Sequence, residues 1–173
     1  GDGFQCTMLD TDENQAAYPQ PRSQKPGLGF PQARVVGLLT LATASLVGAA
    51  LGRCRGKKTG ETALFRQLLD CIRPGDVVVA DRYYCNYWMI ALLLERGADV
   101  VCRMHQKRHV DFRRGRRVGP DDHVVTWTKP PRPNWMDESR YANMAETGTL
   151  REVRFSMAQP AYPGRAVVLS TGL

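Results

Sequence analysis

The sequence predicts an α/β fold in which a mixed β-sheet carries packed helices, and three observations support this. A run of β-branched residues at 77–80 ends in Asp81, an apolar helical stretch follows at 87–96, and a strand-like segment returns at 98–104. A strand, a helix and a second strand in this order form a unit with parallel strands. Parallel sheets bind ligands at the carboxyl edge, and Asp81 is expected there.

Asp81 has two interpretations. It either caps the helix that begins near Asn86 or pairs with Arg82, or it is a ligand at the edge of the sheet. A second carboxylate on a neighbouring strand would favour the ligand interpretation. Asp2 supplies one, directly before the strand-like segment 4–8. We therefore expect Asp2 and Asp81 on adjacent strands, close enough to share a metal ion.

Length and charge restrict the class of protein. The 173 residues suffice for one hydrophobic core, and 24 Lys and Arg against 17 Asp and Glu give a net charge of +7. This charge favours polyanionic partners, with nucleic acid as the first candidate. The five cysteines form no C-x-x-C pair, which favours reduced thiols in the cytoplasm over a zinc ribbon or a disulfide scaffold. The chain has no signal peptide and does not begin with Met, so we expect a fragment of a longer protein.

The composition of two segments before residue 60 bears on their predicted structure. Residues 10–29 are rich in Pro, Gln, Ser and Gly, which predicts a long ordered loop. Residues 35–51 carry no charge and approach the length of a membrane span. Interruption by Gly, Thr and Ser favours an antiparallel hairpin that turns near 43–45 and is buried in the core.

A helix is predicted over 61–73. Thr59 is the expected N-cap, and Pro74 and Gly75 end the helix before the Asp81 strand. Its apolar side chains share one face. They are Leu64, Phe65, Leu68, Leu69 and Ile72.

The segment 103–117 is strongly basic. It continues a core strand and contains two histidines and Phe112, so we expect a rigid hairpin whose cations contact DNA phosphates rather than bases. The predicted phosphate contacts are Lys107, Arg108, Arg113, Arg114, Arg116 and Arg117. Alternating segments at 122–129, 150–157 and 165–171 then predict a mostly antiparallel insertion over 105–160.

Several motifs together resemble the bacterial insertion-sequence transposases of the "IS four" group. These are DDE enzymes with a ribonuclease-H-like catalytic domain. The matching motifs occur in order over most of the chain, which makes them more specific than any single one. They are Asp2-Gly3 with Asp10, Thr11 and Asn14 behind it, Ala16-Ala-Tyr-Pro-Gln-Pro21, and the segments 23–30, 56–61, 76–84 and 110–117.

The resemblance implies a ribonuclease-H-like mixed sheet with flanking helices and a β-rich insertion, incomplete at both ends. It implies catalytic aspartates at Asp2 and Asp81, both binding Mg²⁺ or Mn²⁺, with Arg82 beside them among the DNA contacts. We expect one partial catalytic domain: a core at 1–104, the basic insertion at 105–160 and a final strand at 161–173. The expected partner is DNA, namely the insertion-sequence ends and the target. A homodimer is expected of the full-length protein, and no membrane association.

The chain departs from the family pattern in three places. Phe4 stands where a small hydroxyl residue is usual, and nothing precedes Gly1. The third acidic residue belongs to a helix with the pattern Tyr-x-x-Arg-x-x-x-Glu-x-x-x-x-x-x-Lys, which the 173 residues lack. Glu152 lies in a predicted strand and is not a substitute.

Two function classes therefore follow from the sequence. One is a transposase catalytic-domain fragment that cleaves and joins DNA strands with a metal ion and is inactive alone. The alternative is a non-catalytic, DNA-binding transposase remnant.

Overall fold

The computed structural model describes residues 2–56, 58–105, 107–159 and 162–171, without the side chains of residues 2, 157–159 and 162–166. The chain divides into two compact units, Gly1–Cys71 and Ile72–Leu173. The strands described form two sheets, rather than the single mixed sheet that the sequence predicted. The class is nevertheless mixed α/β, with a three-stranded sheet in the first unit and a six-stranded sheet in the second.

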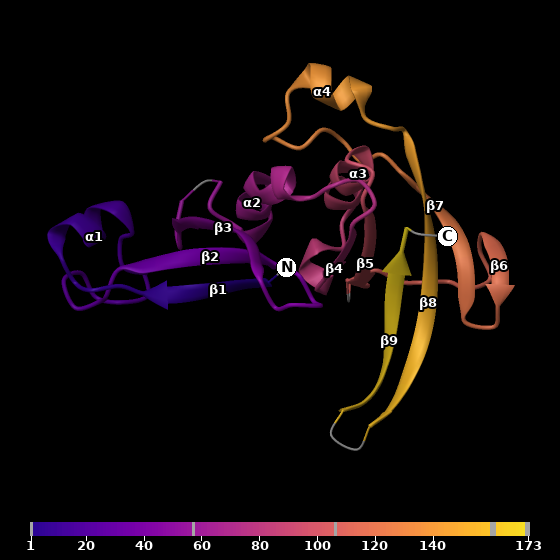
Figure 1. The fold of residues 1–173 in the computed structure, drawn as a ribbon, viewed down its shortest axis with the longest axis horizontal. Coiled ribbons are helices and arrows are strands. Elements are labelled where there is room, and N and C mark those ends of the chain that lie inside the picture. The colour runs from indigo at the N-terminus through magenta and orange to yellow at the C-terminus, as the bar shows by residue number, and fades with distance from the viewer. Residues whose placement is uncertain (1, 57, 106, 160–161, 172–173) are drawn as a thin grey trace. The chain divides into compact units, whose positions relative to one another are not determined.

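The first unit is an antiparallel meander with a short helical layer on one face (Figure 1). Its elements are β1 (Asp2–Thr7), α1 (Asp12–Ala17), β2 (Gln32–Leu39), β3 (Leu46–Arg53), α2 (Glu61–Phe65) and the 3₁₀ helix η1 (Arg66–Cys71). The central strand β2 pairs with β1 on one side and with β3 on the other. Helix α2 packs on β2 and β3, and η1 packs on β3.

The predicted hairpin at 35–51 is confirmed, but it is only partly buried. Strands β2 and β3 pair antiparallel, with a turn at 41–43. Val36 and Ala50 are buried, whereas Leu46 and Leu51 are 62% and 53% exposed. The reason is that α2 and η1 cover one face of the sheet. No helix in the described ranges has the length and apolar character to cross a membrane.

The helix predicted over 61–73 divides into α2 and η1. The predicted apolar face is confirmed, since all five of its side chains are buried. The predicted cap is wrong: Gly60 is the N-cap of α2, and the Thr59 hydroxyl donates to the Gly56 carbonyl at 3.1 Å. Gly52 on β3 allows close packing, because a Cβ there would lie 2.8 Å from Cδ2 of Leu64.

Segment 10–29 is held together by two glutamine amides. The Gln15 side chain donates to Asp10 Oδ1 at 2.7 Å and to the Gly29 carbonyl at 2.8 Å. The Gln20 amide donates to the Lys25 carbonyl at 2.8 Å and accepts from two glycine N–H groups. The segment is ordered, as predicted, but the sequence analysis did not predict α1, which is capped by Thr11.

The second unit combines the predicted β-α-β unit with an antiparallel extension. Its elements are β4 (Val77–Ala80), η2 (Arg82–Tyr84), α3 (Tyr87–Glu95), β5 (Asp99–Arg103), β6 (Arg116–Gly119), β7 (Asp122–Thr128), α4 (Glu138–Asn143), β8 (Thr147–Gln159) and β9 (Tyr162–Ser170). The strand order is β4-β5-β9-β8-β7-β6, in which only β4 and β5 pair parallel. Figure 1 shows the long β8 running between β9 and β7.

The strand before Asp81 is less buried than its composition predicted. Val78 is buried, but Val77 and Val79 are 58% and 47% exposed. Strand β4 is the outermost strand in its sheet, so a continuous apolar run does not here indicate cover on both faces. The parallel pairing and the position of Asp81 directly after β4 are confirmed.

Two glycines have similar positive φ angles but differ in the room available for a side chain. Gly115 and Gly27 have φ angles of +74° and +76°, but a Cβ at Gly115 would lie 2.3 Å from the Val124 carbonyl oxygen, and one at Gly27 would meet nothing within 4 Å. We expect Gly27→Ala to lower the free energy of unfolding by about 1–2 kcal/mol from φ alone. Gly115→Ala should lower the free energy of unfolding by about 1–3 kcal/mol more than Gly27→Ala, because the backbone must shift to make room for the Cβ. Denaturant unfolding of both variants measures this, and equal losses would contradict it.

Candidate functional site

Asp81 is placed where a sheet-edge ligand is expected. It follows β4 directly, its side chain is exposed, and as N-cap residue of η2 it makes no side-chain hydrogen bond to that helix. Asn86 caps α3 instead, accepting from the Met89 N–H at 3.0 Å. The capping interpretation of Asp81 is therefore wrong. Its carboxylate oxygens are hard ligands of the kind that Mg²⁺ prefers.

Asp2 begins β1, opposite Gly37 of β2, and its side chain is outside the described part of the structure. Strands β1 and β4 belong to different sheets and different units. A metal site shared by Asp2 and Asp81 therefore stays a prediction. Among the described residues, no group of three His, Cys, Asp or Glu side chains could hold a metal ion.

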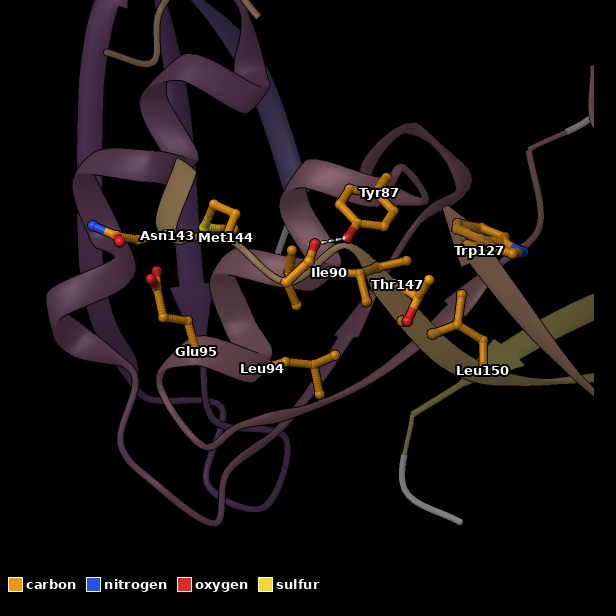
Figure 2. Close-up of a pocket in the computed structure, with 12 residues that line it drawn as sticks. Tyr87, Ile90, Leu94, Glu95, Trp127, Asn143, Met144, Thr147 and Leu150 are labelled. Atoms are coloured by element: carbon orange, nitrogen blue, oxygen red, sulfur yellow. Dashed lines mark hydrogen bonds between the residues drawn. The ribbon is translucent and has the colours of Figure 1, made fainter. Parts of the chain in front are cut away.

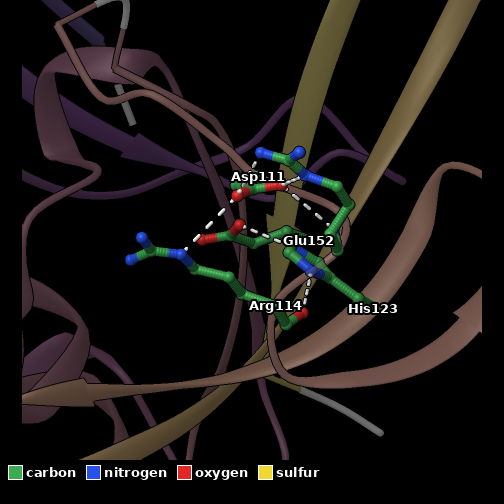
Figure 3. Close-up of polar contacts among 5 residues, drawn as sticks. Asp111, Arg114, His123 and Glu152 are labelled. Carbon is green, nitrogen blue, oxygen red and sulfur yellow. Dashed lines mark hydrogen bonds and ion pairs between the residues drawn. The ribbon is translucent and has the colours of Figure 1, made fainter.

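Glu152 is fully engaged in the core of the second unit, as Figure 3 shows in part. It is 5% exposed, and its carboxylate lies 2.9 Å from Nε2 of His123 and accepts from the Trp127 indole at 3.2 Å. Nδ1 of His123 lies 2.7 Å from the Arg114 carbonyl, which can only accept, so Nδ1 carries a hydrogen. His123 thus contacts the Arg114 carbonyl through Nδ1 and Glu152 through Nε2. This network explains why a glutamate can occupy β8 without serving as a ligand.

The same network positions the basic segment, which we define as residues 107–117. His123 holds the Arg114 carbonyl and stacks on Phe112, with ring centroids 4.6 Å apart. The Arg108 guanidinium lies 3.4 Å from the ring centroid of Trp127. Both anchors depend on the Glu152 carboxylate, so a single buried group connects the sheet to the segment. Cation–π and buried ionic contacts of this type restrict side chains that would otherwise be mobile.

Carboxylates already neutralise part of this segment (Figure 3). Arg113 donates to both oxygens of Asp111, at 2.8 and 3.1 Å, and Arg114 lies 3.6 Å from the same carboxylate. The side-chain hydrogen bond from Arg113 lowers the Asp111 pKa to about 2. Outside the segment, Arg151 pairs with Asp122 and lowers its pKa, and Arg154 pairs with Asp121. The sequence could not reveal the two pairs outside the segment, because each joins β8 to β7 or to the residue before β7.

Strand β6 separates the remaining cations by face. Arg117 lies opposite His123, and Arg116 lies opposite Val124. Directly opposed residues of an antiparallel pair share a face, and successive residues alternate. Arg117 is therefore on the face that carries His123, against which Phe112 packs, and Arg116 is on the other face with Val124. Both are exposed, as is Lys107.

An apolar cavity of about 350 Å³ lies between α3 and the strands β7 and β8 (Figure 2). Ile90, Leu94 and Leu150 are among its lining residues. The Tyr87 hydroxyl donates to the Ala145 carbonyl, and the Trp127 indole is used by Glu152. Burial raises the Tyr87 pKa. These polar groups are engaged in the protein itself, so the cavity does not resemble a site for phosphate chemistry.

Two cysteines that are distant in the sequence meet in the core. Cys85, which follows η2, hydrogen-bonds with Cys102 of β5, and this bond lowers the Cys85 pKa and raises that of Cys102. Cys85 Sγ also lies 3.9 Å from Met104 Sδ. The spacing of the cysteines in the sequence gave no signal of this contact.

Comparison with known proteins gives one informative relationship. The chain is similar to the transposase InsG of insertion sequence element IS4 from Escherichia coli strain K12, with 29% identity over 143 residues. The match covers 78% of this chain and 30% of that transposase, so the chain spans about 30% of the length of its relative. No protein-family model matches the chain. The similarity supports a transposase relationship.

The Asp111 interaction gives a pH prediction. Because its pKa in the folded chain is about 2, below the ordinary 3.8, the pairing with Arg113 stabilises the segment above pH 3.8 and is lost as the pH falls through about 2. NMR titration of the Asp111 carboxyl carbon should give a midpoint near 2, and Arg113→Ala should raise it toward 3.8. Arg114→Ala is the matched control and should move it less, because Arg114 makes a smaller contribution. A midpoint unchanged by Arg113→Ala would contradict the assignment.

Proposed function

We propose that these residues are part of the catalytic domain of a ribonuclease-H-like DDE transposase that acts on the DNA ends of an insertion sequence. The observation that carries the proposal is the position of Asp81. It is an exposed carboxylate at the carboxyl end of a parallel strand, and the cap of α3 does not use it. The similarity to an insertion-sequence transposase supports the reaction class and DNA as the partner.

In this proposal Asp2 and Asp81 hold Mg²⁺ or Mn²⁺, as the resemblance implies. A bound metal ion would activate the attacking oxygen and stabilise the leaving oxygen of a phosphodiester. The protein's own contribution is to fix the Asp81 carboxylate at the strand end and to hold DNA through its cations. Phosphates on the backbone are suitable partners for guanidinium groups, which bind them in a bidentate way.

We also propose that the 173 residues alone do not cut DNA at a useful rate. Two aspartates offer two negative charges to two divalent ions, so the second ion would depend on water and substrate oxygens. Glu152 cannot supply the third carboxylate without leaving His123 and Trp127 unpaired in the core. Because a displacement of about 1 Å can cost a hundredfold in rate, loose ions would fail to align the reacting groups.

The alternative is a DNA-binding remnant without catalysis. The engagement of Glu152 with His123 and Trp127 is compatible with both functions, because Glu152 is a metal ligand in neither. The two proposed functions predict different effects of replacing Asp81. In a remnant, replacing Asp81 would change neither metal binding nor DNA binding.

Metal binding tests the role of Asp81. We expect the 173-residue chain to bind Mn²⁺ weakly and Asp81→Asn to reduce the affinity about tenfold, because one of two charged ligands is lost. Asp76→Asn is the matched control, since the Asp76 carboxylate accepts from the Arg73 N–H at 2.8 Å and caps the turn before β4. Electron paramagnetic resonance of free Mn²⁺ measures the affinity of both variants.

Equal Mn²⁺ affinity in the wild type and in Asp81→Asn would support the remnant. Incubation with Mg²⁺ and DNA of the element's ends completes the test. Nicking by the wild type that disappears in Asp81→Ala would show that two aspartates suffice.

The two arginines of β6 test the proposed DNA face. Arg117→Ala should weaken DNA binding about threefold or more and reduce the salt slope by about 0.9, as expected for one lost phosphate contact. Arg116→Ala should have a smaller effect, because its side chain lies on the opposite face. Fluorescence anisotropy on two unrelated 20-base-pair duplexes should give the same losses. Losses confined to one duplex would instead indicate base recognition.

A further inference from the structure

A second group of arginines lies in the first unit, and none of them is among the residues that the sequence analysis assigned to DNA. A hollow of about 560 Å³ is lined by Pro19, Arg22, Arg53, Arg55 and Gly56. Arg53 ends β3, Arg55 follows it after one residue, and Arg22 belongs to the loop after α1. The three arginines come from two separate segments of the chain, so only the fold brings them together.

Arg53 is fixed in place by the protein. Its Nε donates to the Ala17 carbonyl at 2.7 Å and one terminal nitrogen donates to the Ala16 carbonyl at 3.3 Å, at the end of α1. A guanidinium has five N–H donors in a planar fork, so these two bonds orient the group and leave donors for a ligand. A cation that is already ordered loses less entropy when it binds an anion.

Among the described residues, none that lines the hollow is acidic. In the described part of the second unit, by contrast, five arginines have carboxylate partners: Arg113, Arg114, Arg140, Arg151 and Arg154. Three guanidinium groups around one hollow repel one another, and a bound anion would relieve this repulsion. Among the described residues, the three arginines that line the hollow therefore differ from Arg113 and Arg114, which share the Asp111 carboxylate.

We propose that this arginine hollow, formed by Arg22, Arg53 and Arg55, binds a phosphate of the DNA backbone as a contact separate from the basic segment. The proposal rests on DNA being the partner, as proposed above. A phosphodiester has two charged oxygens that match the guanidinium fork. The hollow is bounded elsewhere by Pro19 and by Gly56, whose φ of +114° suits glycine and which presents no side chain to an approaching backbone.

Anisotropy titrations with a fluorescein-labelled 20-base-pair duplex test the hollow. Arg22→Ala and Arg55→Ala should each weaken binding about threefold or more and reduce the salt slope by about 0.9. Arg140→Ala is the matched control, because it removes the same charge from an arginine that pairs with Glu95. It should change neither quantity. Arg53 is left intact because its side chain also holds α1.

Combination with Arg117→Ala tests whether the contact is separate. The fold-losses of Arg55→Ala and Arg117→Ala should multiply in the double variant, as expected for independent sites. If the wild type binds the duplex but Arg22→Ala and Arg55→Ala behave like Arg140→Ala, the hollow is not a phosphate site and the proposed function stands. If the wild type does not bind the duplex, both proposals fail.

Discussion

The buried Glu152 carboxylate joins β7 and β8 to the basic segment through two side chains. Glu152 lies in the middle of β8, where it would be costly to bury without partners. His123 and Trp127 of the neighbouring strand satisfy its two oxygens, and these two side chains in turn hold Phe112, the Arg114 carbonyl and Arg108. Removing one member of such a group leaves a buried charge unpaired, which typically costs about 3–5 kcal/mol. The shape of the basic segment thus depends on an interaction beneath it.

This dependence separates two uses of charge in the chain. In the second unit, Asp111 pairs with Arg113 and Arg114 within the basic segment, which restricts these side chains and also cancels part of their positive charge. In the first unit, Arg53 is oriented by backbone carbonyls, which restrict the side chain without cancelling its charge. An arginine held by carbonyl oxygens therefore keeps its full attraction for an anion, whereas an arginine held by a carboxylate does not. Counting cations along the sequence does not distinguish them.

Local elements were largely predictable from the sequence, and longer-range relationships were not. The β-α-β unit, the hairpin at 35–51, the apolar face of the helix after Gly60 and the antiparallel extension all follow from periodicity and turn residues. The division into two sheets does not, because a strand's own residues do not specify which other strands it joins. The exposure of Val77 and Val79 has the same origin, since cover depends on neighbours that are distant in the sequence.

For the candidate site, the sequence predicted the position of Asp81 directly after a strand, but it gave neither the partners of Arg151 and Arg154 nor the hollow of the first unit. Periodicity reports which residues face a core. It does not report whether a surface arginine meets a carboxylate from another strand, as Arg151 meets Asp122. The wrong cap at Thr59 is of a similar kind, because its hydroxyl is used by the Gly56 carbonyl instead. Side-chain hydrogen bonds of Ser, Thr, Asn and Asp often have several local options.

Asn86, rather than Asp81, caps α3, and this small difference has a consequence for residue 81. The cap of the helix does not depend on the acidic side chain five residues earlier. A chain that lost Asp81 by mutation would keep the N-cap of α3. Selection for this cap would therefore not preserve the aspartate, and any constraint on residue 81 must come from another property of the chain.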